Sequence, residues 1–169
     1  DSKGVYFNKR AAIWINYLSS GSAVLNCKIH GFGEAIHVGA KHYILTKNGG
    51  NYFSSKSPSN LAFMNNEIIL GEGYYETSGI TMFSSIVSPQ PVKNVLIMGN
   101  YFGMMRSEKT DKEMFLQYGA YVLASSAKNL QIWFNNFDDL NWGYGLRFLY
   151  GVEATVVGNS FYMPWERNQ

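Results

Sequence analysis

Several segments of the chain share one pattern of apolar and polar positions that ends at an asparagine. In most of them the residues five and three places before the asparagine are apolar, and so is the residue two places after it. This period of two predicts a strand with one face buried. The asparagines are Asn48, Asn66, Asn100, Asn135 and Asn159, and one further segment fits with Cys27 in their place.

A second family of short strands is predicted upstream of these segments, each beginning at a small residue. Its members are 35–38, 79–82, 119–122 and 145–148. Two different strands that recur in every repeat, with no helical periodicity between them, argue against a doubly wound sheet or a TIM barrel. The pattern therefore predicts an all-β solenoid of parallel strands.

The spacing of the repeats is uneven. Successive intervals from Cys27 to Asn159 are 21, 18, 34, 35 and 24 residues. We interpret the shortest interval as the basic turn and the longer ones as turns with loop insertions, which repeat proteins place mainly on one face. About six rungs are expected.

The recurring asparagine has a structural interpretation. Asparagine tolerates the left-handed backbone conformation of a sharp bend, and its amide can bond the backbone. Equivalent asparagines stacked about 4.8 Å apart would form an internal ladder. The residues two places further on would stack beside it in the core: Ile29, Ile68, Phe102, Phe137 and Phe161. Cys27 is expected to be a small buried residue of the same column.

Composition narrows the class of protein. The 169 residues include 14 Lys or Arg and 12 Asp or Glu, for a net charge of +2, with 46% hydrophobic and 16% aromatic residues. These values exclude a disordered chain and argue against a nucleic-acid-binding surface built on a basic stripe. No apolar run reaches the eighteen or so residues of a membrane helix, so no membrane insertion is expected. We predict a single domain over residues 1–169.

With rungs of the form apolar-x-apolar-x-x-Asn-x-aromatic over about residues 20–161, the chain resembles a right-handed parallel β-helix of the pectate-lyase-like type. Proteins with this fold include polysaccharide lyases, glycoside hydrolases, epimerases and the tailspikes or depolymerases of bacteriophages. Uneven turns, abundant aromatics and the lack of an amino-terminal capping helix favour the tailspike group. The resemblance implies a place in the virion tail, or alternatively secretion, and a bacterial surface polysaccharide as partner. It also implies that the chain is part of a longer tailspike-like polypeptide, because an uncapped solenoid exposes a pairing edge.

An apolar stripe is predicted on the outside of the solenoid. Met64, Met98, Trp133 and Val157 lie two places before the ladder asparagines and should alternate out of the core, with Leu96 nearby. A monomer seldom leaves such a stripe in water. Either inserted loops cover it, or neighbouring subunits of a homotrimer do, and the sequence leaves both open.

Candidate catalytic carboxylates lie in the insertions. Asp138 and Asp139 follow the fourth ladder asparagine, Glu113 belongs to the preceding turn, and Glu76 to the turn before that. Carboxylates one or two turns apart would be separated by about 5 or 10 Å, close to the separations in retaining and inverting glycosidases. The simpler interpretations are that Asp138 and Asp139 form a solvated turn and that Glu113 caps a short helix. Further acids are Glu34, Glu72, Glu108 and Asp111, whereas Glu67 should point outward and is not expected to be catalytic.

Aromatic side chains accompany these acids and could stack on sugar rings. Trp142 and Tyr144 follow the acid pair, and Tyr74 and Tyr75 come from a neighbouring loop. The second strand family is expected to point four residues outward in one column that could line a groove: His37, Thr81, Tyr121 and Arg147.

No metal or cofactor is predicted. The three histidines, His30, His37 and His42, lack the spacing of metal ligands, and the acids are sparse for a calcium site. Arg147 near the acid pair would suit the base of a lyase that acts on an anionic sugar, but does not require it.

Three functions remain as hypotheses. The first is a tailspike-like β-helix that binds a bacterial surface polysaccharide and hydrolyses it, with Asp138, Asp139 and either Glu76 or Glu113 as acid and base. The second is a non-catalytic receptor-binding or structural shaft. The third is a cellular polysaccharide lyase or epimerase.

Overall fold

A computed structural model describes residues 11–16, 19–39, 57–71, 77–83, 90–105, 120–138 and 144–162. These residues form strands and bends, with no helix among them, and so this part of the chain holds no helix that could cross a membrane. The strands belong to three five-stranded sheets, which we call A, B and C, and every pairing is parallel. The all-β prediction is confirmed.

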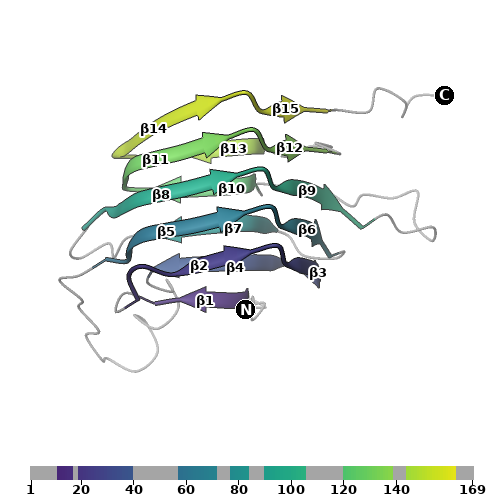
Figure 1. The fold of residues 1–169 in the computed structure, drawn as a ribbon, viewed down its shortest axis with the longest axis horizontal. Helices are drawn as coiled ribbons and strands as arrows, with labels where there is room; N and C mark the ends of the chain where they lie inside the picture. Colours follow the sequence, from purple (N-terminus) through teal and green to yellow (C-terminus); the bar gives the residue numbers. More distant parts are fainter. Residues whose placement is uncertain are drawn as a thin grey trace, which may run out of the picture.

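The chain visits the three sheets in turn, which makes the fold a parallel β-helix (Figure 1). Sheet A has the order β1 (Ala11–Ile15), β4 (Glu34–Gly39), β7 (Ser78–Phe83), β10 (Ala120–Ser125), β13 (Tyr144–Phe148). Sheet B runs through β2 (Ala23–Leu25), β5 (Ser59–Met64), β8 (Val92–Met98), β11 (Ala127–Trp133) and β14 (Val152–Val157). Sheet C runs through β3 (Lys28–Phe32), β6 (Glu67–Leu70), β9 (Tyr101–Met104), β12 (Asn136–Phe137) and β15 (Ser160–Phe161).

The number of rungs is five rather than six. Strand β2 pairs directly with β5, and the backbone N–H of Cys27 donates to Oδ1 of Asn66. No rung from the segment around Asn48, which lies outside the described residues, comes between them in this sheet. The rung at Asn48 was predicted from alternating apolar residues, and this pattern alone does not determine which strand a segment pairs with. The shortest described turn is therefore the 24 residues from Asn135 to Asn159, and the 18-residue interval is not a turn.

The bend from sheet B to sheet C has two residues in every coil, and its first residue is left-handed. Asn65, Gly99 and Phe134 have φ of +54°, +66° and +54°, and each precedes a ladder asparagine. In the first and last coils Asn26 and Gly158, which precede Cys27 and Asn159, are also left-handed. The expectation that the ladder asparagine itself would be left-handed is wrong by one residue. The preceding residue makes the turn, which leaves the asparagine side chain free to point inward.

The predicted ladder is confirmed for four of its five asparagines, all except Asn48, which lies outside the described residues. Asn66 donates both its backbone N–H and Nδ2 to Oδ1 of Asn100, each at 2.9 Å. Asn100 bonds Asn135 in the same way, and Asn135 bonds Asn159. Asn66, Asn100 and Asn135 are at most 2% exposed. Because each amide bonds the next, the ladder fixes the register of all the coils.

A second asparagine ladder on the outside was not predicted. Asn94 donates Nδ2 to Oδ1 of Asn60 at 2.8 Å, and Asn129 donates to Oδ1 of Asn94 at 3.1 Å. All three are exposed and have φ between +53° and +57°. They stand six residues before a ladder asparagine in each coil, so the repeat contained the signal.

Aromatic rings stack in the core beside the inner ladder, as predicted. The ring centroids of Phe102 and Phe137 are 5.0 Å apart, and those of Phe137 and Phe161 are 4.9 Å apart, both pairs at 14°. Tyr121 packs against Phe102 and Phe137 and is fully buried, so its predicted outward orientation is wrong. The pattern aligned Tyr121 with Thr81. In the structure Thr81 is aligned with Leu123, which lies two residues further along β10.

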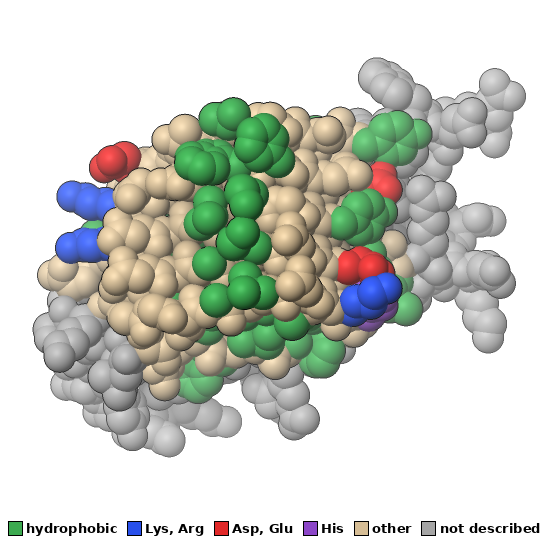
Figure 2. Space-filling model, in the orientation of Figure 1, with side chains coloured by type: hydrophobic (Ala, Val, Ile, Leu, Met, Phe, Trp, Pro, Cys, Tyr) green, Lys and Arg blue, Asp and Glu red, His purple; other side chains and the backbone are tan. Residues whose placement is uncertain are grey.

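The predicted outer apolar stripe is present on sheet B. Figure 2 shows hydrophobic side chains in a continuous band over this sheet. Five residues are in register along it: Leu25, Met64, Met98, Trp133 and Val157. Leu25 is 47% and Val157 45% exposed.

Candidate functional site

Two groups of polar side chains in the described structure contain residues that the sequence predicted for a site or groove. One group surrounds Asp138 at the end of sheet C, and the other surrounds His37 on sheet A. We take the Asp138 group first, because it includes predicted catalytic and substrate-binding residues.

Asp138 directly follows β12 and is held from the coil before it. Its backbone N–H donates to the carbonyl oxygen of Phe102 at 2.9 Å. Its Oδ2 accepts a hydrogen bond of 2.7 Å from the hydroxyl of Tyr101, the first residue of β9. The carboxylate is thus oriented by a phenol one coil away, a partner that the sequence alone did not indicate.

The position of the Tyr101 ring depends on a glycine in the same strand. A Cβ atom at Gly103 would lie 3.1 Å from Cε1 of Tyr101 and 3.3 Å from its hydroxyl oxygen. These distances are tighter than ordinary van der Waals contacts, so a side chain at Gly103 would push the ring away. Because Gly103 has no side chain, the Tyr101 ring can occupy the position from which its hydroxyl reaches Asp138.

Tyr121 fixes the backbone at the same point. Its hydroxyl donates to the carbonyl oxygen of Asp138, while its ring lies in the core stack. A fully buried ring presents no face to a sugar in this structure. Tyr121 therefore holds the backbone of Asp138 from the core side.

Tyr144 and Arg147 form a second aromatic and charged pair, on β13. The guanidinium carbon of Arg147 lies 5.4 Å from the ring centroid of Tyr144, within the range of a cation–π contact. Tyr144 is 52% exposed. An exposed ring beside a cation is suited to stacking on a sugar and to attracting an acidic group.

Six predicted site residues lie outside the described residues: the acids Asp139, Glu113 and Glu76, and the aromatics Trp142, Tyr74 and Tyr75. The separations between catalytic carboxylates therefore stay predictions. Asp138 is the one predicted catalytic acid whose surroundings are described.

Glu67 points outward, as predicted, and takes part in surface ion pairs. Its carboxylate lies 3.1 Å from Nζ of Lys28 and 2.8 Å from Nε2 of His30. The hydrogen bond from Lys28 holds the pKa of Glu67 below its ordinary value, with His30 acting in the same direction. Figure 2 shows these acidic, basic and histidine side chains close together beside sheet C.

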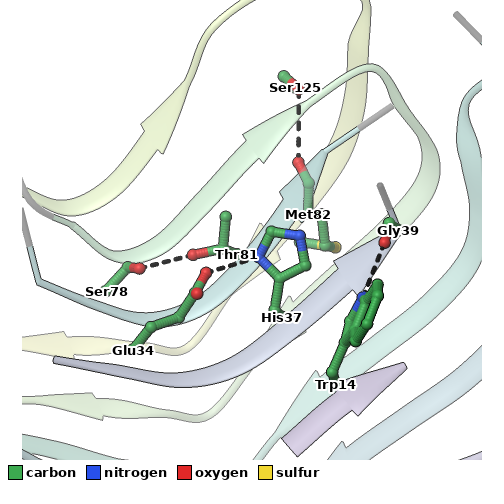
Figure 3. Close-up of polar contacts among 8 residues, drawn as sticks. All are labelled: Trp14, Glu34, His37, Gly39, Ser78, Thr81, Met82 and Ser125. Atoms are coloured by element: carbon green, nitrogen blue, oxygen red, sulfur yellow. Dashed lines mark hydrogen bonds and ion pairs between the residues drawn. The ribbon is translucent and has the colours of Figure 1, made fainter. Parts of the chain in front are cut away.

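The second polar group joins two adjacent strands of sheet A (Figure 3). Nδ1 of His37 lies 2.7 Å from Oε1 of Glu34, and the hydroxyls of Ser78 and Thr81 are 2.6 Å apart. The register sets Glu34 beside Ser78 and His37 beside Thr81. All four are at most 6% exposed, so the predicted solvent-lined column is wrong for His37 and Thr81.

Packing explains how this group is held. The indole Nε1 of Trp14 donates to the carbonyl oxygen of Gly39 at 3.0 Å, and the His37 ring stacks on Phe83 at 6.3 Å. A carboxylate and an imidazole that are hydrogen-bonded and shielded from water act as structural polar contacts. The repeated polar-x-x-polar spacing of Glu34 with His37 and of Ser78 with Thr81 was the sequence signal for it.

We find no preformed metal site among the described residues. They contain no group of three or more His, Cys, Asp or Glu side chains that could hold an ion. Cys27 is half-buried, and its Sγ lies 3.3 Å from the carbonyl oxygen of Leu25.

Comparison of the chain with protein-family models, with curated proteins and with solved structures found no match. Function must therefore be argued from the geometry of this molecule.

Proposed function

We propose that this chain is a β-helical domain of the right-handed, pectate-lyase-like tailspike type, which binds a bacterial surface polysaccharide and hydrolyses it. In this proposal Asp138 and Asp139 act with Glu113 or Glu76 as acid and base. Tyr144, Arg147, Trp142, Tyr74 and Tyr75 contact the sugar. The protein would work at the tail of a virion.

One observation carries this proposal, namely the order of the connections. All four proposed acids lie where the chain passes from sheet C to sheet A, in the connections 71–77, 105–119 and 138–143. Because the coils are stacked in parallel, these connections leave the helix at one edge in three successive coils. A long sugar chain lying along that edge would meet acids and aromatics from each of them.

The contact between Tyr101 and Asp138 adds chemical support. A carboxylate fixed by a phenol keeps one orientation, which general acid–base catalysis requires. The exposed Tyr144 ring and the Arg147 guanidinium follow Asp138 along the chain and supply stacking and charge.

The test compares variants on purified surface polysaccharide with an assay for new reducing ends. Asp138→Asn together with Asp139→Asn should abolish sugar release and retain binding, because the amides keep the shape and lose the acid–base function. Glu67→Gln is the matched control, since that outward carboxylate is not part of the proposed chemistry and should leave release unchanged. Undiminished release by the double variant would contradict the assignment.

A non-catalytic receptor-binding shaft is the second candidate, and the same Tyr101 contact favours it. A carboxylate that accepts a phenolic hydrogen bond is also a good acceptor for sugar hydroxyls. In that case the unaltered protein would bind polysaccharide and release no reducing ends. Unsaturated products that absorb in the ultraviolet and depend on calcium would instead indicate a lyase.

The outer stripe of sheet B supports the proposal of a homotrimer. Leu25 and Val157, in its first and last coils, are about half exposed in the single chain, and Met64, Met98 and Trp133 between them are partly exposed. Association would remove these side chains from water. Light scattering after size exclusion tests this. Met98→Glu would place a charge in the middle of the stripe and should give a monomer, whereas a monomeric unaltered chain would contradict the proposal.

A further inference from the structure

Sheet C differs from sheet B in the character of its outer face. Ile29, Ile68, Phe102 and Phe137 point into the core, so the residues that alternate with them point outward. One outward column is in register through all five coils and is polar apart from one aromatic ring. Its members are Lys28, Glu67, Tyr101, Asn136 and Ser160. Glu67 is half-buried and the other four are exposed.

Tyr101 is the aromatic residue of this column, and its side chain is held in place. It is 36% exposed, and its hydroxyl donates to Oδ2 of Asp138. A Cβ atom at Gly103 would lie 3.1 Å from Cε1 of Tyr101 and 3.2 Å from Cδ1 of Ile69, so these two side chains together fill the space above the glycine. A side chain that is fixed in advance loses little conformational entropy when a ligand packs on it. Tyr101 is therefore suited to bind a ligand by ring contact.

The residues on either side of Tyr101 lie one coil away, at about the 4.8 Å spacing of neighbouring strands. On one side Asn136 presents an exposed amide, which can both donate and accept hydrogen bonds. On the other side Glu67 is engaged by Lys28 at 3.1 Å and by His30 at 2.8 Å, so we assign it no bond to the ligand. A ring with an amide beside it matches a sugar, which has both a C–H face and hydroxyl groups.

Charge narrows the class of sugar. Carboxylates lie on two sides of the ring, with Asp138 at its hydroxyl and Glu67 in the preceding coil. They would repel the phosphate of a nucleotide or the carboxylate of an acidic sugar at this position. Lys28, the cation of the column, is two coils from Tyr101 and is paired with Glu67. A neutral sugar unit fits this surface best.

We propose that Tyr101 is the stacking residue of a subsite for a neutral pyranose unit on the outer face of sheet C. The C–H face of the sugar packs on the ring, and the amide of Asn136 bonds one of its hydroxyl groups. This inference rests on the proposed function, because the pyranose belongs to the polysaccharide that reaches Asp138. It adds a sugar contact on sheet C and specifies that the unit beside Asp138 carries no charged group.

The test uses an array of purified bacterial surface polysaccharides as the probe, followed by calorimetric titration of the neutral polysaccharide that binds most tightly. Tyr101→Ala should raise its Kd by about 10-fold or more, because the ring is lost. Tyr101→Phe keeps the ring and should stay within about 3-fold of the unaltered chain. Tyr150→Ala is the matched control, since it removes a 53% exposed tyrosine between sheets A and B, and it should leave the Kd unchanged.

Asn136→Ala tests the subsite without altering the ring. It should raise the Kd by about 3-fold or more, because one hydrogen bond to the sugar is lost. Circular dichroism checks that each variant is folded, and if Tyr101→Ala is not, Asn136→Ala decides. An unchanged Kd in the folded variants would overturn the subsite, and so would binding of acidic polysaccharides alone.

Reducing ends are measured in the same samples, which separates this inference from the proposed hydrolysis. Sugar release together with a Kd that does not depend on Tyr101 or Asn136 would overturn the subsite alone. Binding that depends on Tyr101, without release by the unaltered chain, would support the subsite and contradict hydrolysis. Binding to no member of the array would overturn both.

Discussion

The internal ladder allows a sharp test, because the sequence places a buried and an exposed asparagine side by side. Asn135 is 2% exposed, and its Oδ1 accepts the backbone N–H and Nδ2 of Asn100, both at 2.9 Å. Its Nδ2 donates to Oδ1 of Asn159 and to the carbonyl oxygens of Ile97 and Trp133, at 2.9 to 3.1 Å. Asn136, the next residue, is exposed in β12.

Asn135→Leu keeps the size of the side chain and removes all of these bonds. The backbone N–H of Asn100 and the carbonyl oxygen of Ile97 each lose a buried partner, whereas Oδ1 of Asn159 keeps the backbone N–H of residue 135. At about 1–3 kcal/mol for each buried group left unsatisfied, the cost is about 2–6 kcal/mol. Burial of the leucine side chain returns about 2 kcal/mol. The free energy of unfolding should therefore fall by about 2 kcal/mol at the middle of the range.

Urea unfolding followed by circular dichroism measures the difference directly. Asn136→Leu is the control, with the same chemical change on the adjacent exposed position, and it should change the free energy of unfolding by less than about 0.5 kcal/mol. If the two variants lose the same stability, or if Asn135→Leu loses less than the control, the ladder does not stabilise the fold in the way described.

Three further predictions concern other features of the coils. Phe134→Asn should stabilise the protein by about 1 kcal/mol in urea unfolding, because Phe134 is left-handed, where asparagine is tolerated better. Gly39→Ala should destabilise it by more than about 2 kcal/mol, since the added carbon would collide with the backbone oxygen of Phe83 at a φ of +96°. Glu67 contributes stability at neutral pH that is lost below about pH 4.5, as falling pH reaches its lowered pKa. Lys28→Gln should raise that pKa in an NMR titration.

Each of these has a control or a contradicting result. Phe134→Ala removes the same ring but keeps the unfavourable left-handed backbone of a residue other than Asn or Gly. It should therefore not raise the free energy of unfolding as Phe134→Asn does. Gly21→Ala is the control for Gly39, because Gly21 also has positive φ but no atom within 4 Å of the added carbon. An unchanged pKa of Glu67 in the Lys28 variant would contradict the assignment of the shift to that hydrogen bond.

The parallel β-helix and its ladder could be predicted because their signals repeat. One asparagine at a fixed distance from two apolar residues recurs in each coil, and only strand spacing lets its amide reach the next. The left-handed residue was misplaced because it varies along the coils, from Asn65 to Gly99 to Phe134. The false rung at Asn48 had the local pattern of a strand, while strand pairing is decided by residues far away in the sequence.

The candidate site was less predictable because its contacts depend on three-dimensional packing. Nothing near Tyr101 in the sequence links it to Asp138, which is 37 residues away. Tyr121 was assigned outward from its place in a short segment, whereas its ring packs against Phe137 in the core. Burial of His37 and Thr81 likewise follows from packing rather than from alternation.

The charges nevertheless distinguish the two edges at which the coils have insertions. The connections from sheet A to sheet B, 40–58 and 84–91, contain no Asp or Glu, and the first holds three lysines. The connections from sheet C to sheet A hold seven of the twelve acidic residues of the chain. Acid–base hydrolysis needs two carboxyl groups, so hydrolysis at the first edge would lack both. If the protein hydrolyses a polysaccharide as proposed, the sugar chain is therefore expected along the edge between sheets C and A, where Tyr101 orients Asp138.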